Sequence, residues 1–160
     1  MRKTLSFAVL GAIVVSSFAT TAMSQAKTSG ERAKTLAVVI STRKLPKLGT
    51  VLVNSKGRTL YMFVPDKRSK VTCVKSCAVI WPPVKLPKGA KAVAAGMAKR
   101  SLLRSDPNPA GGRVVTYNGW PLYTYITDTA AGRAKGQALN LNGGLWYVIA
   151  PSGRVIRTKA

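Results

Sequence analysis

The chain has 160 residues, of which 26 are lysine or arginine and only four are aspartate or glutamate, so its formal net charge is +22. Histidine is absent, which excludes a histidine-based serine or cysteine triad and haem attachment that needs a histidine ligand. Four carboxylates leave few pairs for acid–base chemistry. The basic excess would attract polyanions, and it also fits a surface adapted to an acidic or solute-rich medium.

Residues 1–24 have the features of a cleaved signal peptide. Residues 1–3 form a positive start, residues 5–19 are apolar and uncharged, and small residues precede two alternative cleavage points near Ser24. The apolar run is shorter than the roughly 20 residues that a membrane-spanning helix needs. We therefore expect a Sec-type export signal, a mature protein in the periplasm or outside the cell, and no transmembrane anchor after cleavage.

The mature chain predicts short β-strands joined by turns. A basic segment over residues 25–45 contains one expected strand at 35–41. Each further strand is a short run rich in β-branched or aromatic residues, bounded by glycine, proline, asparagine or serine. These runs cover residues 50–54, 58–64, 114–117, 122–126, 145–150 and 154–157. Only residues 91–103 have the alanine, methionine and leucine content of a short helix.

A ten-residue phrase occurs twice, as GRTLYMFVPD at 57–66 and as GWPLYTYITD at 119–128, which indicates a tandem repeat. Each half, at about 60 residues, is near the lower limit for a separate core, so the halves should share one. The sequence predicts a mainly β, small single domain of two pseudo-symmetric β-hairpin repeats with at most one short helix. This two-repeat domain occupies residues 46–160. Its parts are repeat one at about 46–84, a connecting segment at about 85–112 and repeat two at about 113–153.

Each phrase contains the pattern Tyr-x-aromatic-x-x-Asp. The motif residues are Tyr61, Phe63 and Asp66 in repeat one, and Tyr123, Tyr125 and Asp128 in repeat two. Trp81 and Trp146 follow the two aspartates at comparable places, which indicates repeat-equivalent core residues.

These motifs, in this order, resemble those of the bacterial predicted-lipoprotein family that is also called the secreted repeat of unknown function. The similarity spans about residues 46 to 153 and includes Cys73-x-x-x-Cys77 and the Trp81-Pro-Pro83 that follows. The chain lacks the lipid-bearing cysteine of many such lipoproteins, and its basic excess is unusual for them. The resemblance implies export and a repeated β-rich domain, and it supplies no established chemistry.

Cys73 and Cys77 are the only cysteines, and an exported protein meets an oxidising compartment, so we expect a disulfide between them. Because the loop is short, the chain-entropy model gives this bridge a stabilisation of about 2 kcal/mol. Thiol redox activity and capture of a soft metal with Met62 are the alternatives. The spacing differs from Cys-x-x-Cys, and few further ligands exist for a metal. We expect no metal and no cofactor.

Asp66 and Asp128 form the one carboxylate pair with a structural argument, because a pseudo-two-fold axis would relate them and could create a shared-proton dyad. The favoured alternative is that each aspartate caps a turn or pairs with a cation such as Arg58, Lys67 or Arg133. A redox protein or hydrolase using either pair is therefore the rival to a non-enzymatic protein. Since histidine is absent and the cysteines are expected to be oxidised, stability should be nearly constant between about pH 5 and 8.

Eighteen basic residues lie between Lys27 and Arg104, and only six follow. We therefore expect a polyanion-binding face on the N-terminal segment and the first repeat, with anionic polysaccharide, lipopolysaccharide or lipid headgroups as partners. Nucleic acid is disfavoured because no nucleic-acid-binding signature is present. Candidate anion-binding residues are Lys67, Arg68, Lys70 and Lys75. Trp120, in a turn, is the aromatic residue that we expect to be most exposed.

Overall fold

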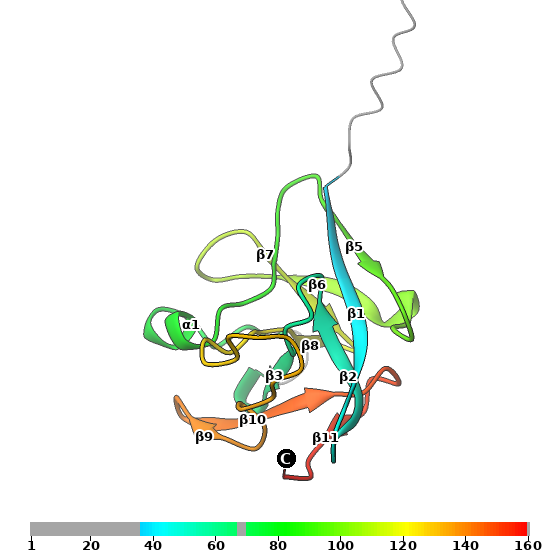
Figure 1. Cartoon of the computed structure of the whole chain (residues 1–160). Helices are drawn as coiled ribbons and strands as arrows, with labels where there is room; N and C mark the ends of the chain where they lie inside the picture. Colours follow the sequence, from blue (N-terminus) through cyan, green and yellow to red (C-terminus); the bar gives the residue numbers. More distant parts are fainter. Residues whose placement is uncertain (1–35, 67–69, 160) are drawn as a thin grey trace, which may run out of the picture. The chain divides into compact units, whose positions relative to one another are not determined.

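Short β-strands are the main regular secondary structure of the described part of the chain, which covers residues 36–66 and 70–159 of the computed structural model (Figure 1). All of these residues belong to one compact unit, Ala33–Ala160. The predictions of a mainly β fold class and a small single domain are confirmed. The predicted signal peptide and the first part of the basic segment lie outside the described residues.

The first sheet joins the basic N-terminal segment to the first repeat and to the connecting segment. Its central strand, β1 (Ala37–Leu45), pairs antiparallel with β2 (Gly49–Asn54) and parallel with β5 (Lys91–Ala94). In Figure 1, β1 in cyan runs beside β5 in green. The strand expected in the basic segment is therefore present, although it extends further along the chain than residues 35–41, and it forms part of the domain.

The helix expected over residues 91–103 is wrong. This stretch forms β5, the 3₁₀ turn η2 (Arg100–Leu102) and the start of β6 (Leu103–Pro107). Pairing with β1 and burial against the core outweigh a weak local helix propensity. The α-helix of the described residues is instead α1 (Ser76–Ile80), whose five residues carry no helical periodicity.

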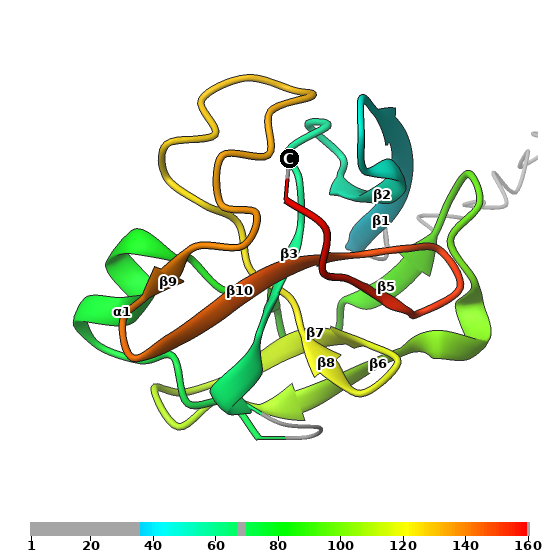
Figure 2. The same cartoon turned by 90° about the horizontal axis from the view of Figure 1, so that it is seen from below.

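The other two sheets contain the strands of repeat two, together with β3 of repeat one and two strands of the connecting segment, β4 and β6. One has the order β11-β10-β3 with β9 paired to β10, and the other has the order β4-β7-β6 with β8 paired to β7. Figure 2 shows β10 as the long strand that crosses β3. The remaining bounds are β3 (Tyr61–Phe63), β4 (Lys85–Leu86), β7 (Arg113–Tyr117), β8 (Trp120–Pro121), β9 (Asn140–Leu141), β10 (Gly144–Ile149) and β11 (Val155–Ile156).

The hairpin turns follow the sequence signals. Asn118 and Gly119 have φ values of 50° and 78°, as the two-residue turn between β7 and β8 requires. A second hairpin joins β10 to β11 at the predicted place. In repeat one, Thr59 and Leu60 pair with β2, after which the chain pairs with β10 as β3. The strand predicted at 58–64 is thus divided between two partners.

Two buried clusters lie on opposite faces of β3. Tyr61 and Phe63 belong to the first cluster and Met62 to the second, because successive side chains of a strand alternate between its faces. The first cluster also contains Trp81 and Trp146, which are fully buried, as predicted for repeat-equivalent core residues.

Candidate functional site

The two copies of the Tyr-x-aromatic-x-x-Asp motif meet at the centre of the first cluster. The backbone amide of Tyr61 donates to the carbonyl of Tyr123 at 2.9 Å, and the amide of Tyr123 donates back to the carbonyl of Tyr61 at 3.0 Å. This reciprocal antiparallel pair relates the two repeats by an approximate two-fold axis. Each tyrosine consequently faces the other repeat.

The tyrosine side chains exchange hydrogen bonds across this axis. The Tyr61 hydroxyl donates to Asp128 Oδ2 at 2.5 Å, and the Tyr123 hydroxyl donates to Asp66 Oδ2 at 2.6 Å. All four side chains are almost completely buried. We call this arrangement the reciprocal Tyr–Asp pairs, and it joins the two repeats through polar groups that have no access to solvent.

The second oxygen of each carboxylate holds the loop that follows it. Asp66 Oδ1 accepts from the Thr72 amide at 2.7 Å and from the Thr72 hydroxyl at 2.6 Å. Asp128 Oδ1 accepts from the Lys135 amide at 2.9 Å. The expectation that the aspartates stabilise a turn is therefore met by loop-organising hydrogen bonds. A side-chain ion pair with Arg58 is absent, because its guanidinium donates to the backbone carbonyl of Asp128.

Burial controls the titration of these groups. Desolvation raises the pKa of Asp66, although hydrogen bonds from Thr72 and Tyr123 act in the opposite direction. Desolvation is also the main reason why the pKa values of Tyr61 and Tyr123 are raised far above the ordinary tyrosine value, and the facing carboxylates add to the effect. Both phenols therefore stay protonated and act as donors over the whole physiological pH range.

The geometry does not produce the shared-proton dyad considered from the sequence. Within the described residues no hydrogen bond joins Asp66 to Asp128; each carboxylate pairs with a tyrosine of the opposite repeat instead. The exposed fractions of the two aspartates are 0% and 1%, so neither faces an open cleft. The reciprocal contacts agree with the two-fold relation expected from the sequence, but they pair unlike groups, because a carboxylate and a phenol satisfy each other without a buried like-charge repulsion.

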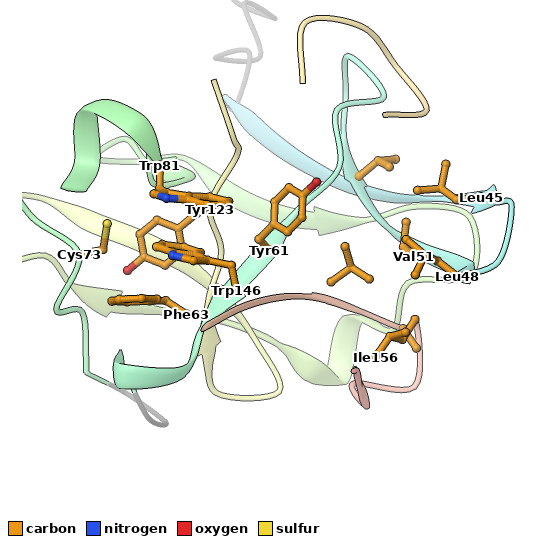
Figure 3. Close-up of a cluster of buried hydrophobic side chains, with 13 residues drawn as sticks. Leu45, Leu48, Val51, Tyr61, Phe63, Cys73, Trp81, Tyr123, Trp146 and Ile156 are labelled. Atoms are coloured by element: carbon orange, nitrogen blue, oxygen red, sulfur yellow. The ribbon is translucent and has the colours of Figure 1, made fainter. Parts of the chain in front are cut away.

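A stack of four aromatic rings lies beside the reciprocal Tyr–Asp pairs. Its centre is Trp81 on Trp146, with ring centroids 3.8 Å apart and planes 3° from parallel. Phe63 stacks on the outer face of Trp146 at 4.2 Å, and Tyr125 stacks on Trp81 at 4.1 Å. Figure 3 shows Trp81, Trp146 and Phe63 as successive parallel rings. The aromatic residue of each motif thus packs on the tryptophan of the other repeat.

The predicted disulfide between Cys73 and Cys77 is present, with the two Cα atoms 5.2 Å apart. Cys73 is buried against the first cluster, close to the stacked rings in Figure 3. The bridge encloses the turn from which α1 begins, and α1 leads directly to Trp81. The disulfide therefore fixes the segment that places Trp81 in the stack of aromatic rings. Among the described residues no group of three or more metal-ligating side chains occurs.

Of the basic residues singled out from the sequence, Lys70 and Lys75 have exposed side chains. Lys67 and Arg68 lie outside the described residues, so an anion-binding role for this group stays a prediction. Trp120 is half-buried and packs against the second cluster, while most other aromatic residues of the described part are buried. The turn leaves it against the sheet because β8 pairs with β7.

The structure gathers a different set of cations that sequence reasoning missed. Lys91, Arg100, Arg104 and Arg113 line one hollow of about 420 Å³, which we call the cationic groove. They come from β5, η2, β6 and β7, and no run of adjacent charges marks them in the sequence. The parallel pairing of β5 with β1 has no local signal in the sequence, and it places Lys91 on a strand that packs beside β6.

The fold and the reciprocal pairs define a two-repeat β-domain whose halves are joined by exchanged tyrosine–aspartate hydrogen bonds and a shared aromatic stack. A family model described as a secreted repeat of unknown function matches residues 42–85 and 107–150, one match for each motif, and the chain belongs to this family. Searches of curated proteins and of solved structures gave no match. No helix within residues 36–66 and 70–159 is both long and apolar enough to span a membrane.

Proposed function

We propose that the protein is an exported, non-enzymatic module that binds anionic components of the cell envelope. The observation that carries this proposal is the burial of two of the chain's acidic residues. Asp66 and Asp128, two of the four acidic residues in the chain, are buried and committed to internal hydrogen bonds. They cannot neutralise neighbouring surface cations by forming exposed ion pairs.

The basic side chains, in contrast, are at the surface. Lysine and arginine residues in the described part of the chain are exposed or half-buried. A surface with this excess of one sign produces a field that concentrates anions and accelerates their association. Membership in a family described as secreted supports envelope polymers, rather than cytoplasmic nucleic acid, as the anions that the protein meets.

The site chemistry supports binding over catalysis. The two motif carboxylates have no access to a substrate, and the two cysteines are joined in a disulfide whose first member is buried. A pre-formed disulfide and a rigid aromatic core suit a domain that presents a fixed surface outside the cell. The reciprocal Tyr–Asp pairs would then maintain the shape of that surface.

Binding of the purified protein to polygalacturonate, lipopolysaccharide and anionic phospholipid vesicles tests the proposal. We expect binding to at least one of these at low ionic strength and a steep loss of affinity as salt is added, because the contacts are between charges. Neutral dextran is the control and should not bind. An absence of binding to all three anionic probes at low ionic strength would overturn the proposal.

A further inference from the structure

The cationic groove lies where the edge of the first sheet meets the sheet β4-β7-β6. Its floor is apolar, formed by Leu86, Ala92 and the buried Leu103, all of which pack into the second cluster. The four cationic side chains that line it are exposed. The carboxylate nearest in sequence, that of Asp106, does not line the groove.

Hydrogen bonds inside the groove orient its guanidinium groups. Arg113 donates through Nε to the Ser105 hydroxyl at 2.8 Å and through Nη2 to the Ser105 carbonyl. Arg104 donates through Nη1 to the carbonyl of Leu103 at 2.6 Å. A guanidinium that is already oriented loses less conformational freedom when it binds an anion, so these contacts prepare the groove for carboxylate or phosphate oxygens.

A second hollow of about 390 Å³ adjoins the groove. The two share Leu86, Ser105 and Arg113, and the second adds Lys88. Both volumes fall within the range of about 300–1,000 Å³ that is typical of ligand sites. Cations therefore line two adjoining hollows that share Arg113, which suits a chain with repeated negative groups better than a single small anion.

We propose that the cationic groove and the adjoining hollow bind a segment of an acidic polysaccharide, which deepens the proposed function and rests on it. A flexible chain can enter a concave surface, whereas a bilayer is contacted by protruding apolar or aromatic groups. Single-stranded nucleic acid is commonly held by aromatic side chains on which its bases stack, and no aromatic residue lines either hollow. The apolar floor accommodates sugar rings while the cations take their anionic groups.

Two variants of equal charge test this site. The groove variant combines Lys91→Gln, Arg100→Gln and Arg104→Gln. The control variant combines Lys44→Gln, Lys56→Gln and Arg154→Gln, which are exposed and line neither hollow. Arg113 is left intact because it is part of the β6–β7 structure. Thermal unfolding of both variants checks that the fold is retained.

Affinity for polygalacturonate is measured at several salt concentrations. We expect the groove variant to lose about tenfold or more and to show a shallower salt dependence, while the control variant loses no more than about threefold. Equal losses in the two variants would mean diffuse attraction and would overturn the groove while leaving the proposed function intact. Binding of the unaltered protein to vesicles or DNA but not to the polysaccharide would overturn the occupant. No binding to any anionic probe would remove the proposed function as well.

Discussion

The two repeats form the same hydrogen bond to a tyrosine but fix the adjacent loop differently. In repeat one, Thr72 donates to Asp66, and the backbone amide of the next residue, Cys73, acts to lower the pKa of the Tyr123 phenol. The disulfide and α1 then hold this loop. A covalent link therefore maintains the polar contact in repeat one.

In repeat two the corresponding position is Gly136, whose amide donates to the Tyr61 hydroxyl at 3.2 Å. A Cβ atom here would lie 2.7 Å from the Trp81 ring and 2.9 Å from the Tyr61 ring, so only glycine fits. The next residue, Gln137, is buried; it accepts from the Val148 amide at 2.8 Å and donates to the carbonyls of Ile156 and Thr158. Close packing and an amide network replace the disulfide.

Contacts that cross the two-fold axis differ in kind from contacts made within one repeat. The crossing contacts, the reciprocal Tyr–Asp pairs and the ring stack, have the same chemistry in both directions, because each half supplies the partner of the other. The local contacts differ, since each needs only to fix its own loop. The two stacked tryptophans also differ in their hydrogen bonding. Trp146 Nε1 donates to the Leu141 carbonyl at 3.0 Å, whereas Trp81 Nε1 is buried without a partner within the described residues.

The largest expected effect comes from breaking the ring stack. Trp81→Ala and Trp146→Ala should each lower the free energy of unfolding by about 3–5 kcal/mol, because each leaves a cavity at the centre of the first cluster. Urea unfolding followed by circular dichroism measures the loss. A loss below about 1 kcal/mol in either variant would contradict the central role of the stack.

Phenylalanine substitutions test whether only one of the two tryptophans makes a stabilising hydrogen bond. Trp146→Phe should cost about 1 kcal/mol more than Trp81→Phe, because the first removes a hydrogen bond and the second removes a buried donor that has no partner. Trp120→Phe, at a half-buried position in the second cluster, serves as the control for a general loss of indole contacts. Equal costs at Trp81 and Trp146 would show that Trp81 Nε1 is satisfied in solution.

The next largest effect comes from the reciprocal Tyr–Asp pairs. Tyr61→Phe and Tyr123→Phe should each cost about 1–3 kcal/mol, since a buried carboxylate loses a donor. Double-mutant cycles with Asp66→Ala and Asp128→Ala then reveal the pairing. We expect coupling of about 0.5–3 kcal/mol for Tyr61 with Asp128 and for Tyr123 with Asp66.

Pairs within one motif provide the matched control. Tyr61 with Asp66, and Tyr123 with Asp128, share no hydrogen bond in the structure, so their effects should be closer to additive. Stronger coupling within a motif than between the two repeats would contradict the exchange.

Local features of the fold could be predicted from the sequence, whereas features that depend on distant partners could not. The Asn118-Gly119 turn and the Cys73–Cys77 bridge depend on a few adjacent residues, and both are present. Residues 91–94 form a strand because they pair in parallel with residues of β1 that are more than 50 positions away in the chain. Local composition therefore wrongly favoured a helix.

The sequence contains only part of the information needed to predict the reciprocal Tyr–Asp pairs. The equal spacing of Tyr61 to Asp66 and of Tyr123 to Asp128 predicts a two-fold relation. It does not say whether like or unlike groups meet across the axis. A rule that buried carboxylates seek a donor would have favoured tyrosine over a second aspartate. The cationic groove had no comparable signal, because its residues converge only in the folded sheets.

Removing the local contacts that hold each loop should have a smaller effect and should distinguish the repeats. These contacts are the disulfide in repeat one and the Gln137 hydrogen bonds in repeat two. The Cys73→Ala/Cys77→Ala variant should lose at most about 2 kcal/mol, because the disulfide closes a short loop. Gln137→Leu should lose about 1–3 kcal/mol, because it leaves backbone groups in and beside β10 without partners. Urea unfolding with and without reductant separates the two: reductant should weaken the unaltered protein and the Gln137 variant, but not the cysteine variant. A cysteine variant that still responds to reductant would contradict this assignment.

The smallest expected effect is a dependence of stability on pH that comes from Asp66. Burial raises the pKa of Asp66, so the folded protein keeps this proton to a higher pH than the unfolded chain, where an aspartate titrates at about 3.9. The folded state then binds more protons, and the free energy of unfolding should fall as pH rises from about 4 through the folded-state pKa, then level off. Melting temperatures from pH 4 to 8 test this. Asp66→Asn should flatten the decline, while Asp128→Asn, which retains the Asp66 carboxyl, should preserve it. A decline that survives in Asp66→Asn would place its origin elsewhere, and a flat profile in the unaltered protein would mean that hydrogen bonds from Thr72 and Tyr123 fully offset the cost of burying the charge.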